Sequence, residues 1–423
     1  ACNVAVGSYS LAQNTTAANN VSIGDSSMFD NTTGASNVAV GGSALSNNTT
    51  ASNNVAVGAN SLLKNTTGTE NTGIGAGGVL ICNTTGSNNT SVGMNASYCN
   101  TTGATNAAFG SNAMVFNTTG ALNVAIGSMA LCKNTTASSN TAIGEKSLRV
   151  STTGTENTMI GRETGLTNTT GNCNTVVGMR AFKDNTTGTG NVAIGYHALC
   201  TNTTAGVSVA IGLCAMQSNT TGASNTAVGT NALQDNTTGG DNVSLGRSSM
   251  VKNTTGSCNT GLGNDALACN TSGGNNVAVG FCALKANTTA NDNTAIGFKA
   301  MITNTTGNTN AAIGGFALAA NTTGRCDFAV GNSSLQDNTT GQSNVAMGYL
   351  TLGANTTGGN NTAYGHCALR CNTTANGNTG IGCGALKSVN AAGGTNTALG
   401  EAAGGNVTTG CFNTLIGHAT NPS

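Results

Sequence analysis

The chain has 423 residues, with 62 Gly, a single Pro and no Trp, and its 14 basic and 14 acidic residues give zero formal net charge. This balance offers no electrostatic basis for binding nucleic acid or an anionic membrane. No apolar run approaches the roughly 20 residues of a membrane-spanning helix.

A repeat of 17 residues runs through the sequence. It is first visible in the segments Val4–Gly7, Val21–Gly24 and Val38–Gly41. These segments end in an anchor glycine, which recurs 25 times from Gly7 to Gly417, and 22 of the 24 intervals are 17 residues long. The two other intervals, Gly75 to Gly93 and Gly382 to Gly400, are 18 residues long. Fixed periods of this kind are typical of stacked repeats, so we expect one continuous array over residues 1–423 without a linker.

The repeat length selects the fold class. Seventeen residues hold neither a βαβ crossover nor a helix pair, but they hold one turn of a narrow coil with two or three short strands. We therefore predict an all-β protein, a β-solenoid of about 25 coils whose short strands stack in parallel, about 4.8 Å apart.

Within one coil, positions are counted from the anchor glycine at position 0. Positions −3 to −1 read as a short strand, whose β-branched residues we expect in the core as a ladder of Val6, Ile23, Val40, Val57 and Ile74. A Leu or Met at position +4 predicts a second strand, as at Leu45, Leu131, Leu267 and Leu369. The invariant glycine at position 0 predicts a positive φ or no room for a Cβ. Position +10 is usually Gly but is Ala in some coils, so it does not require a left-handed backbone.

Two columns of asparagine accompany this pattern. Position −4 is Asn in 23 of 25 coils, the exceptions being Ser208 and Asp327, and predicts a hydrogen-bonded amide ladder. Position +7 is Asn in 21 of 24 coils. The Thr-Thr that follows makes it either a second ladder or a column of N-glycosylation acceptors. The candidate glycosylation sites are Asn14, Asn31, Asn48, Asn65, Asn83, Asn100, Asn117 and Asn134. The paired Thr columns at +8 and +9 allow a third interpretation, ice binding, in which one Thr per coil would face outward.

The 15 cysteines form no Cys-x-x-Cys motif and so indicate no zinc site. Cys82 and Cys99 occupy the same place in adjacent coils, roughly 5 Å apart if stacked, and are a candidate disulfide. Cys367 and Cys383 are a second candidate pair. Four others, Cys2, Cys173, Cys258 and Cys326, share position −5 but lie many coils apart, so they are either free thiols or cross-links between molecules. Together with the acceptor sequences, this cysteine content favours an oxidising, extracellular or cell-surface setting.

No arrangement of residues predicts catalysis. The three histidines lie on separate coils without a carboxylate cluster, so neither a metal site nor a general base is expected. The segment Gly73–Gly78 matches a dinucleotide-binding fingerprint, but no helix is expected after it. We therefore expect no enzyme, no cofactor and no metal.

The unit Asn191–Gly195, continued by Ala198-Leu199 and Asn202-Thr203-Thr204, resembles the head repeats of trimeric autotransporter adhesins and the repeats of phage-type and bacterial surface fibres. This resemblance covers essentially the whole chain. It implies β-rolls, commonly trimeric, that project from a surface and bind a host or matrix.

These observations lead to three expectations for function. The first is a structural subunit of an extracellular filament or surface fibre that stacks end to end, because neither end of the array shows the atypical, polar coil that usually protects a solenoid. The second is the binding head of an adhesin or tail-fibre-like protein, and the third is ice binding through Thr and Asn ladders. The expected partners are copies of the chain itself, as a filament or homotrimer, with glycans or a host surface as further candidates.

Overall fold

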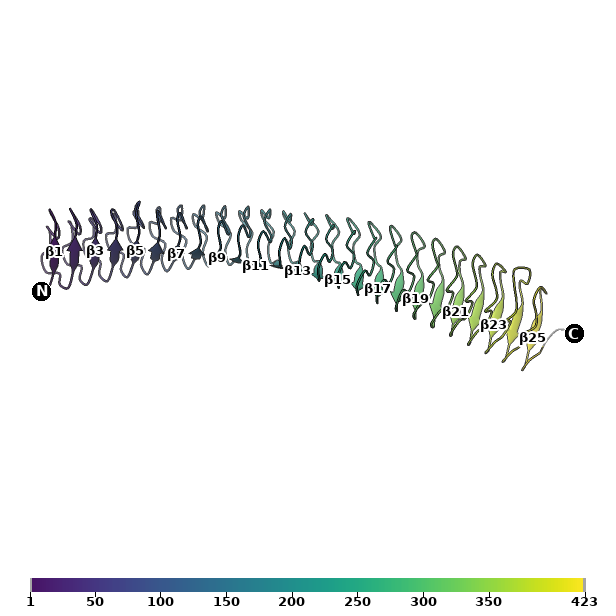
Figure 1. Cartoon of the computed structure of the whole chain (residues 1–423). Helices are drawn as coiled ribbons and strands as arrows, with labels where there is room; N and C mark the ends of the chain where they lie inside the picture. The colour runs from purple at the N-terminus through teal and green to yellow at the C-terminus, as the bar shows by residue number, and fades with distance from the viewer. Residues whose placement is uncertain (1, 421–423) are drawn as a thin grey trace. The chain divides into compact units, whose positions relative to one another are not determined.

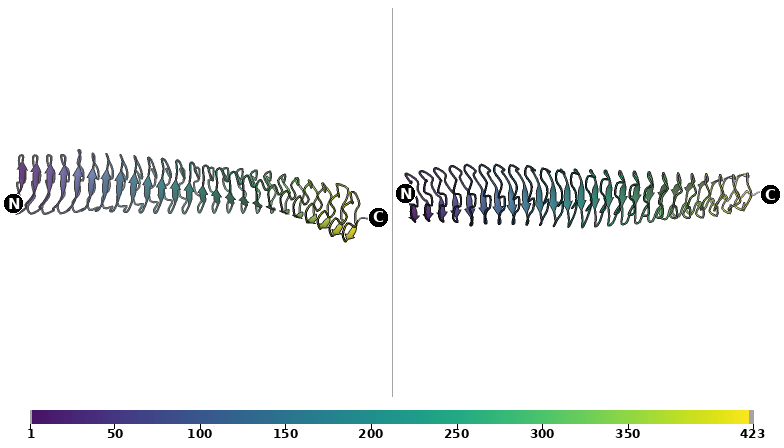
Figure 2. Two further views of the ribbon diagram at one scale, coloured as in Figure 1. Left: turned by 60° about the horizontal axis from the view of Figure 1, so that its bottom comes forward. Right: turned by 90° about the horizontal axis from the view of Figure 1, so that it is seen from above.

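The computed structural model describes residues 2–420. The chain divides into two compact units, Ala1–Ser208 and Val209–Ser423, and each is described by itself. Each unit is a parallel β-solenoid with one coil per repeat, and no helix occurs between residues 2 and 420. Within a unit, successive coils lie side by side in chain order (Figures 1 and 2). The predicted fold class is confirmed, whereas the single continuous array over residues 1–423 stays a prediction.

Each coil contributes one strand of three residues, always at positions −3 to −1. The first unit contains β1 (Val4–Val6), β2 (Val21–Ile23), β3 (Val38–Val40), β4 (Val55–Val57), β5 (Thr72–Ile74), β6 (Thr90–Val92), β7 (Ala107–Phe109), β8 (Val124–Ile126), β9 (Thr141–Ile143), β10 (Thr158–Ile160), β11 (Thr175–Val177) and β12 (Val192–Ile194). The second contains β13 (Val209–Ile211), β14 (Thr226–Val228), β15 (Val243–Leu245), β16 (Thr260–Leu262), β17 (Val277–Val279), β18 (Thr294–Ile296), β19 (Ala311–Ile313), β20 (Phe328–Val330), β21 (Val345–Met347), β22 (Thr362–Tyr364), β23 (Thr379–Ile381), β24 (Thr397–Leu399) and β25 (Thr414–Ile416).

Strands of neighbouring coils pair in parallel and in register, so residues at the same repeat position stack on one another. Val21 pairs with Val38, for example, and Ile23 with Val40. The extra residue between Gly75 and Gly93 leaves this register intact, because Thr72 still pairs with Thr90. The insertion is absorbed after β5, where Gly77 and Gly78 have positive φ.

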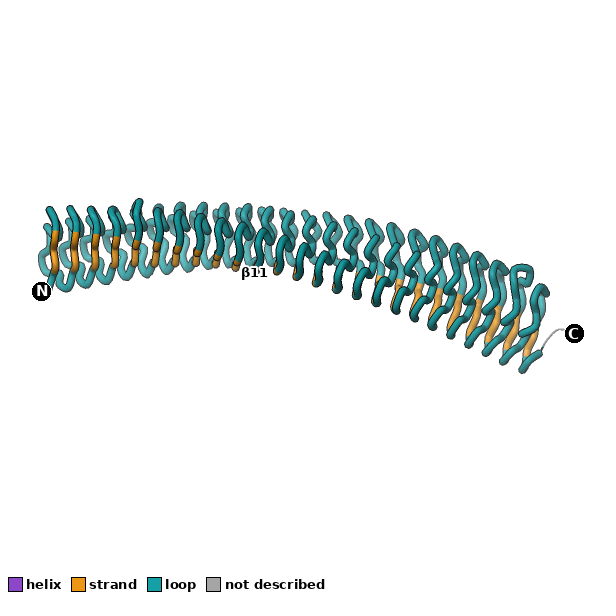
Figure 3. Tube along the Cα trace, viewed as in Figure 1, coloured by secondary structure: helices purple, strands orange, loops and turns teal. Residues whose placement is uncertain are grey.

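The prediction of a second strand at position +4 is wrong. Apart from its single strand, each coil is loop and turn (Figure 3). The reason lies in the backbone, since residues at positions +2 and +4 adopt left-handed conformations, as at Ser43 (φ 57°) and Leu45 (φ 52°). Such residues fold the segment into tight turns. Their amides still bond along the axis: Leu45 N donates to Ser61 O (3.0 Å) and Ser43 N to Asp25 O (2.8 Å).

The expected orientation of the strands is also wrong. The β-branched residues at −3 and −1 face outward, and only the small middle residue at −2 is buried, as in β3, where Ala39 is buried between half-buried Val38 and Val40. Ile23 and Ile74, which we expected in the core, are 39% and 37% exposed. The interior is narrow, and the Leu at +4 already fills it. Only Ala, Ser or Gly then fits at −2 in most coils.

In two places the core exchanges large and small residues between positions −2 and +4. Where position −2 is the large Met159, position +4 of the same coil is Gly165, and a Cβ on Gly165 would lie 2.9 Å from Met159 Cε. Leu415 similarly occupies the space beside Gly404 of the preceding coil, where an added Cβ would lie 2.7 Å from Leu415 Cδ1. Large and small residues therefore compensate for one another, as dense packing requires.

The anchor glycines carry both features that their invariance predicts. Their φ lies between 123° and 147° in all 25 coils, a region that side chains disfavour. A Cβ on Gly110 would also lie 2.7 Å from Gly127 O of the next coil. At position +10, in contrast, Gly34 and Gly68 have no positive φ, as expected from the exchange of Gly for Ala there.

Candidate functional site

The asparagines at position −4 form the predicted ladder. Asn37 N donates to Asn20 Oδ1 of the preceding coil (2.9 Å), and Asn37 Nδ2 donates to Ala51 O of its own coil (2.9 Å). One side chain thus joins two coils and also ties the start of its coil to the end. The buried amides are satisfied, which is what burial of polar groups requires.

The asparagines at position +7 form a second ladder beside the first. Asn48 Nδ2 donates to Asn31 Oδ1 (2.8 Å) and also to Ala51 O (2.9 Å), the carbonyl that Asn37 contacts. Both ladders therefore meet at the carbonyl of position +10. The +7 ladder stops where the next asparagine is missing. Asn134 Oδ1 and Asn372 Oδ1 are buried without a hydrogen bond because Ser151 and Val389 follow them.

This geometry bears directly on the candidate glycosylation sites. Asn31, Asn48, Asn65, Asn83, Asn100, Asn117 and Asn134 are at most 1% exposed, and Asn14 is half-buried. N-linked sugar attaches to Nδ2, the atom that donates both ladder bonds. A sugar at any of the seven buried residues is incompatible with the folded coil, so the ladder is the interpretation that the geometry supports.

The threonines at +8 and +9 separate into two environments. The +8 hydroxyl donates to the +8 carbonyl of the next coil, as from Thr32 Oγ1 to Thr49 O (3.0 Å). The +9 side chain is exposed, as at Thr33. One Thr per coil therefore faces solvent, in a turn and not on the sheet.

A regular surface is formed by the side chains at −3 and −1, which we call the outward sheet face. Position −1 is Val, Ile, Leu, Met, Phe or Tyr in every one of the 25 coils, and position −3 is Val, Thr, Ala or Phe. Residues at −1 remain substantially exposed inside the array, as shown by Ile126 (39%) and Ile313 (40%). Apolar surface that extends over many coils is typical of interaction sites. Sequence reasoning missed this face because it assigned these side chains to the core.

Aromatic residues widen the face in the second unit. Phe281 and Phe298, at position +1 of adjacent coils, are 45% and 48% exposed, and their ring centroids are 5.6 Å apart. Phe316 lies edge-on to Phe298 at 5.3 Å, and Lys299 Nζ lies 5.1 Å from the Phe298 ring centroid. These rings adjoin the exposed Ile296 and Ile313 in the chain and add to the apolar surface.

The candidate disulfides are free thiols in the structure. Burial, together with the nearby thiol of Cys82, raises the pKa of Cys99, so those two cysteines lie within electrostatic reach. In the second pair, Cys367 Sγ lies 3.8 Å from His366 Nε2 and Cys383 Sγ lies 4.0 Å from His366 Nδ1. The imidazole is thus the contact of both sulfurs. Both disulfides stay predictions.

The exposed cysteines at position −5 are Cys2, Cys173, Cys258 and Cys326. A hydrogen bond to Glu156 raises the pKa of the Cys173 thiol, so this thiol is not activated as a nucleophile.

Residues 2–420 contain no helix long and apolar enough to cross a membrane. Over the same residues, no three His, Cys, Asp or Glu side chains are grouped so as to hold a metal ion.

Comparison of the sequence with known proteins identifies no family. No protein-family model and no curated protein matches its sequence.

Proposed function

We propose that the protein is a structural subunit of an extracellular filament or surface fibre, without catalytic activity, whose copies associate through the outward sheet face. The observation that carries the proposal is the column at position −1, which is apolar in every coil and exposed or half-buried throughout. The partner on this face is a second copy of the chain. Two copies placed in parallel would match repeat for repeat, since both carry the same period.

The energetics favour a long contact over a short one. Burying the exposed part of one −1 side chain is worth about 1 kcal/mol. Twelve coils of one unit then offer on the order of 10 kcal/mol, which is comparable with the estimated 4–15 kcal/mol that association costs. A contact over one or two coils falls well below this cost, so only a contact over many coils can offset it. Because the face carries no charge, no ionic group has to be desolvated.

Axial stacking is a second mode of assembly that the same repeats support. Each coil donates and accepts backbone hydrogen bonds toward both neighbours, as Leu45 and Ser43 do. One face of a coil is therefore complementary to the opposite face of any other coil, and copies stacked end to end would continue the pattern.

The adhesin head, implied by the resemblance to autotransporter repeats, remains the second candidate, because the aromatic patch of Phe281, Phe298 and Phe316 breaks the uniformity of the face. Ice binding is less favoured. The exposed Thr at +9 stands in a turn, and on the outward sheet face Thr occurs only at −3, in 12 of 25 coils, always beside an apolar side chain at −1.

The test places charges on the face. The triple variant Ile126→Lys, Ile160→Lys, Ile194→Lys puts three lysines on the outward sheet face of the first unit. The matched control, Thr119→Lys, Thr153→Lys, Thr187→Lys, puts them at exposed +9 positions of the same unit. Sedimentation velocity and electron microscopy should show assemblies for the parent chain and the control, and fewer or smaller assemblies for the face variant, whose second unit keeps an unaltered face. Circular dichroism should show the same fold in all three. Single chains of the parent protein at every concentration would refute the proposal.

A further inference from the structure

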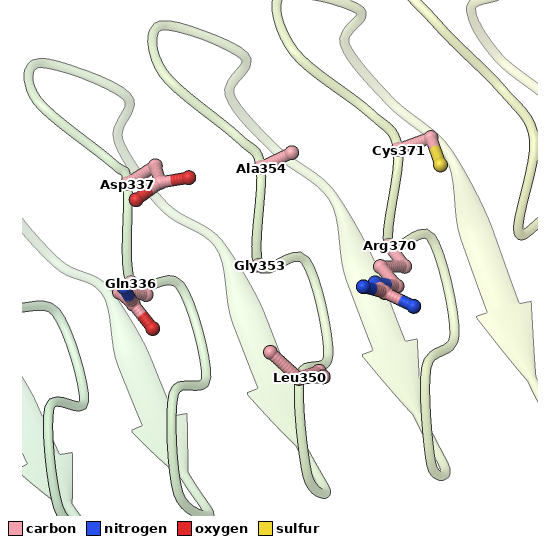
Figure 4. Close-up of a pocket in the computed structure, with 7 residues that line it drawn as sticks. All are labelled: Gln336, Asp337, Leu350, Gly353, Ala354, Arg370 and Cys371. Atoms are coloured by element: carbon pink, nitrogen blue, oxygen red, sulfur yellow. The ribbon is translucent and has the colours of Figure 1, made fainter.

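One coil of the second unit leaves a notch in the surface. At positions +5 and +6, where most coils carry larger side chains, this coil has Gly353 and Ala354. The coil before it presents Gln336 and Asp337, the coil after it presents Arg370 and Cys371, and Leu350 completes the lining (Figure 4). The notch has a volume of about 370 Å³, which lies within the range of small-molecule sites.

The two walls carry opposite charges that do not meet. Asp337 and Arg370 are exposed, and neither side chain makes an ion pair or hydrogen bond within the described residues. Opposite charges on adjacent coils are close enough to pair, as Arg180 does with Glu163 (2.8 Å). Asp337 and Arg370 are two coils apart, roughly 10 Å along the axis. The small side chains between them leave that space open.

The walls are held in place by the coil itself. Asp337 N donates to Gly353 O (3.1 Å), and Ala354 N donates to Arg370 O (3.1 Å). The three coils therefore keep a fixed spacing. A ligand would find the backbone from which Asp337, Arg370 and Leu350 project already arranged, so only side-chain ordering adds to the entropic cost of binding.

We propose that this notch binds a small zwitterion of the dipeptide class, with its ammonium on Asp337, its carboxylate on Arg370 and an apolar side chain against Leu350. An extended dipeptide spans at most about 7 Å, and hydrogen bonds of about 2.8 Å at its ends bring its reach to the separation of the walls. Arg370 can hold a carboxylate with two parallel hydrogen bonds. This binding is independent of the assembly proposed above, because the outward sheet face is formed by positions −3 and −1.

Three variants address the parts of the site. Gly353→Gln fills the notch with the side chain that Gln336 carries at the same repeat position, and Gly353 has no positive φ that would forbid it. Asp337→Asn and Arg370→Gln each remove one exposed charge. Ser46→Gln, at position +5 of a coil in the first unit, is the matched control for the added side chain.

The probes are glycyl-L-leucine, its N-acetyl derivative and its C-terminal amide, measured with the full chain by ligand-observed NMR titration. Glycyl-L-leucine should bind, and each capped form should bind at least about fivefold more weakly, the loss expected for one charge-assisted hydrogen bond. Arg370→Gln should abolish the preference for the free carboxylate and Asp337→Asn the preference for the free ammonium, while Gly353→Gln should abolish binding and Ser46→Gln should leave it unchanged. Equal binding of all three probes, no binding at all, or unchanged binding to Gly353→Gln would overturn the proposal.

Discussion

A single atom distinguishes Asp327 from the asparagines that share its position. In the neighbouring coils, Asn310 Nδ2 donates to Gly324 O (2.8 Å) and Asn344 Nδ2 to Gly358 O (2.9 Å). An ionised aspartate has no donor for the equivalent carbonyl. Its oxygens only accept: Oδ1 from Asn344 N and Nδ2, and Oδ2 from Asn338 Nδ2. Burial outweighs these hydrogen bonds and raises the pKa of Asp327 to about 7.

Replacing this carboxyl should change how stability depends on pH. The pKa of Asp327 is higher in the folded chain, about 7, than its ordinary 3.8. The protonated carboxyl therefore makes its full contribution to folding stability below pH 3.8, and this contribution is lost as the pH rises through 7. The loss is on the order of 4 kcal/mol. Asp327→Asn supplies the missing donor and does not titrate. In thermal unfolding, the midpoint of the variant should rise relative to that of the parent as the pH increases from 5 to 8. Parallel pH profiles of the two proteins would contradict this account.

Filling the gap in the +7 ladder should stabilise the chain. Ser151 leaves Asn134 Oδ1 buried without a donor. Ser151→Asn would provide Nδ2 at the place where Asn48 bonds Asn31 in an intact stretch. We expect a gain of about 1 kcal/mol or more, measured as a raised unfolding midpoint. Ser138→Asn, at a position outside the ladder, is the control and should have little effect.

The same ladder predicts that the acceptor sequences carry no sugar. When the chain is secreted from a eukaryotic host, Asn31, Asn48, Asn65, Asn83, Asn100, Asn117 and Asn134 should add no glycan mass to that of the sequence. The folded coil has no space for a glycan on these Nδ2 atoms. Intact mass before and after an N-glycosidase measures this. A mass decrease on treatment, mapped to any of these residues, would be inconsistent with the ladder.

At the scale of one coil, the side chains at −2 and +4 share one interior space. Most coils combine a small residue at −2 with Leu or Met at +4, as do Ala142 and Leu148, whereas the next coil reverses the sizes with Met159 and Gly165. Gly165 has φ 53°, close to the φ 52° of Leu148, so the backbone is the same in both versions.

A double-mutant cycle should expose this compensation. Met159→Ala alone leaves a cavity and should cost about 2–5 kcal/mol. Gly165→Leu alone overfills the coil and should cost about 1–3 kcal/mol. The double variant recreates the common Ala and Leu combination and should unfold near the parent midpoint, with a coupling well above 1 kcal/mol. Additive losses would show that the two side chains do not share one space.

Much of the coil could be predicted from sequence, and the failures have a physical cause. The period, the strand position and the backbone of the anchor glycine follow from strict repetition. Alternation along a strand, however, shows only that Val38 and Val40 lie on the same face. We predicted that this face is buried because both residues are hydrophobic, and hydrophobicity alone does not decide this. The restriction of position −2 to small residues was the available signal, because size is limited only where neighbours are close. The left-handed turns at +2 and +4 carried no signal, since Leu45 and Ser43 are not residues that favour them. The notch at Gly353 could not be predicted from the sequence, because its lining depends on the relative positions of residues from three coils.

For the molecule as a whole, stability and the proposed assembly draw on different surfaces. Each coil of a unit is held by its two neighbours through the asparagine ladders, the small core and backbone bonds along the axis, as in other solenoids. The outward sheet face takes no part in these bonds. Its apolar side chains therefore remain available, over every coil of a unit, for a second chain.

This separation predicts a distinctive response to salt. An interface between uncharged faces should be almost unchanged between 0.05 and 0.5 M NaCl, because screening acts on charges and the chain has no net charge to screen. Ammonium sulfate should strengthen it, since sulfate is excluded from protein surface and favours apolar burial. Sedimentation velocity of the intact chain across both salts measures the effect, with the Ile126, Ile160, Ile194 lysine variant as the control that should assemble less than the parent in each salt. Assemblies that fall apart in moderate NaCl would place the contact on the scattered charged residues instead, because only ion pairs weaken under those conditions.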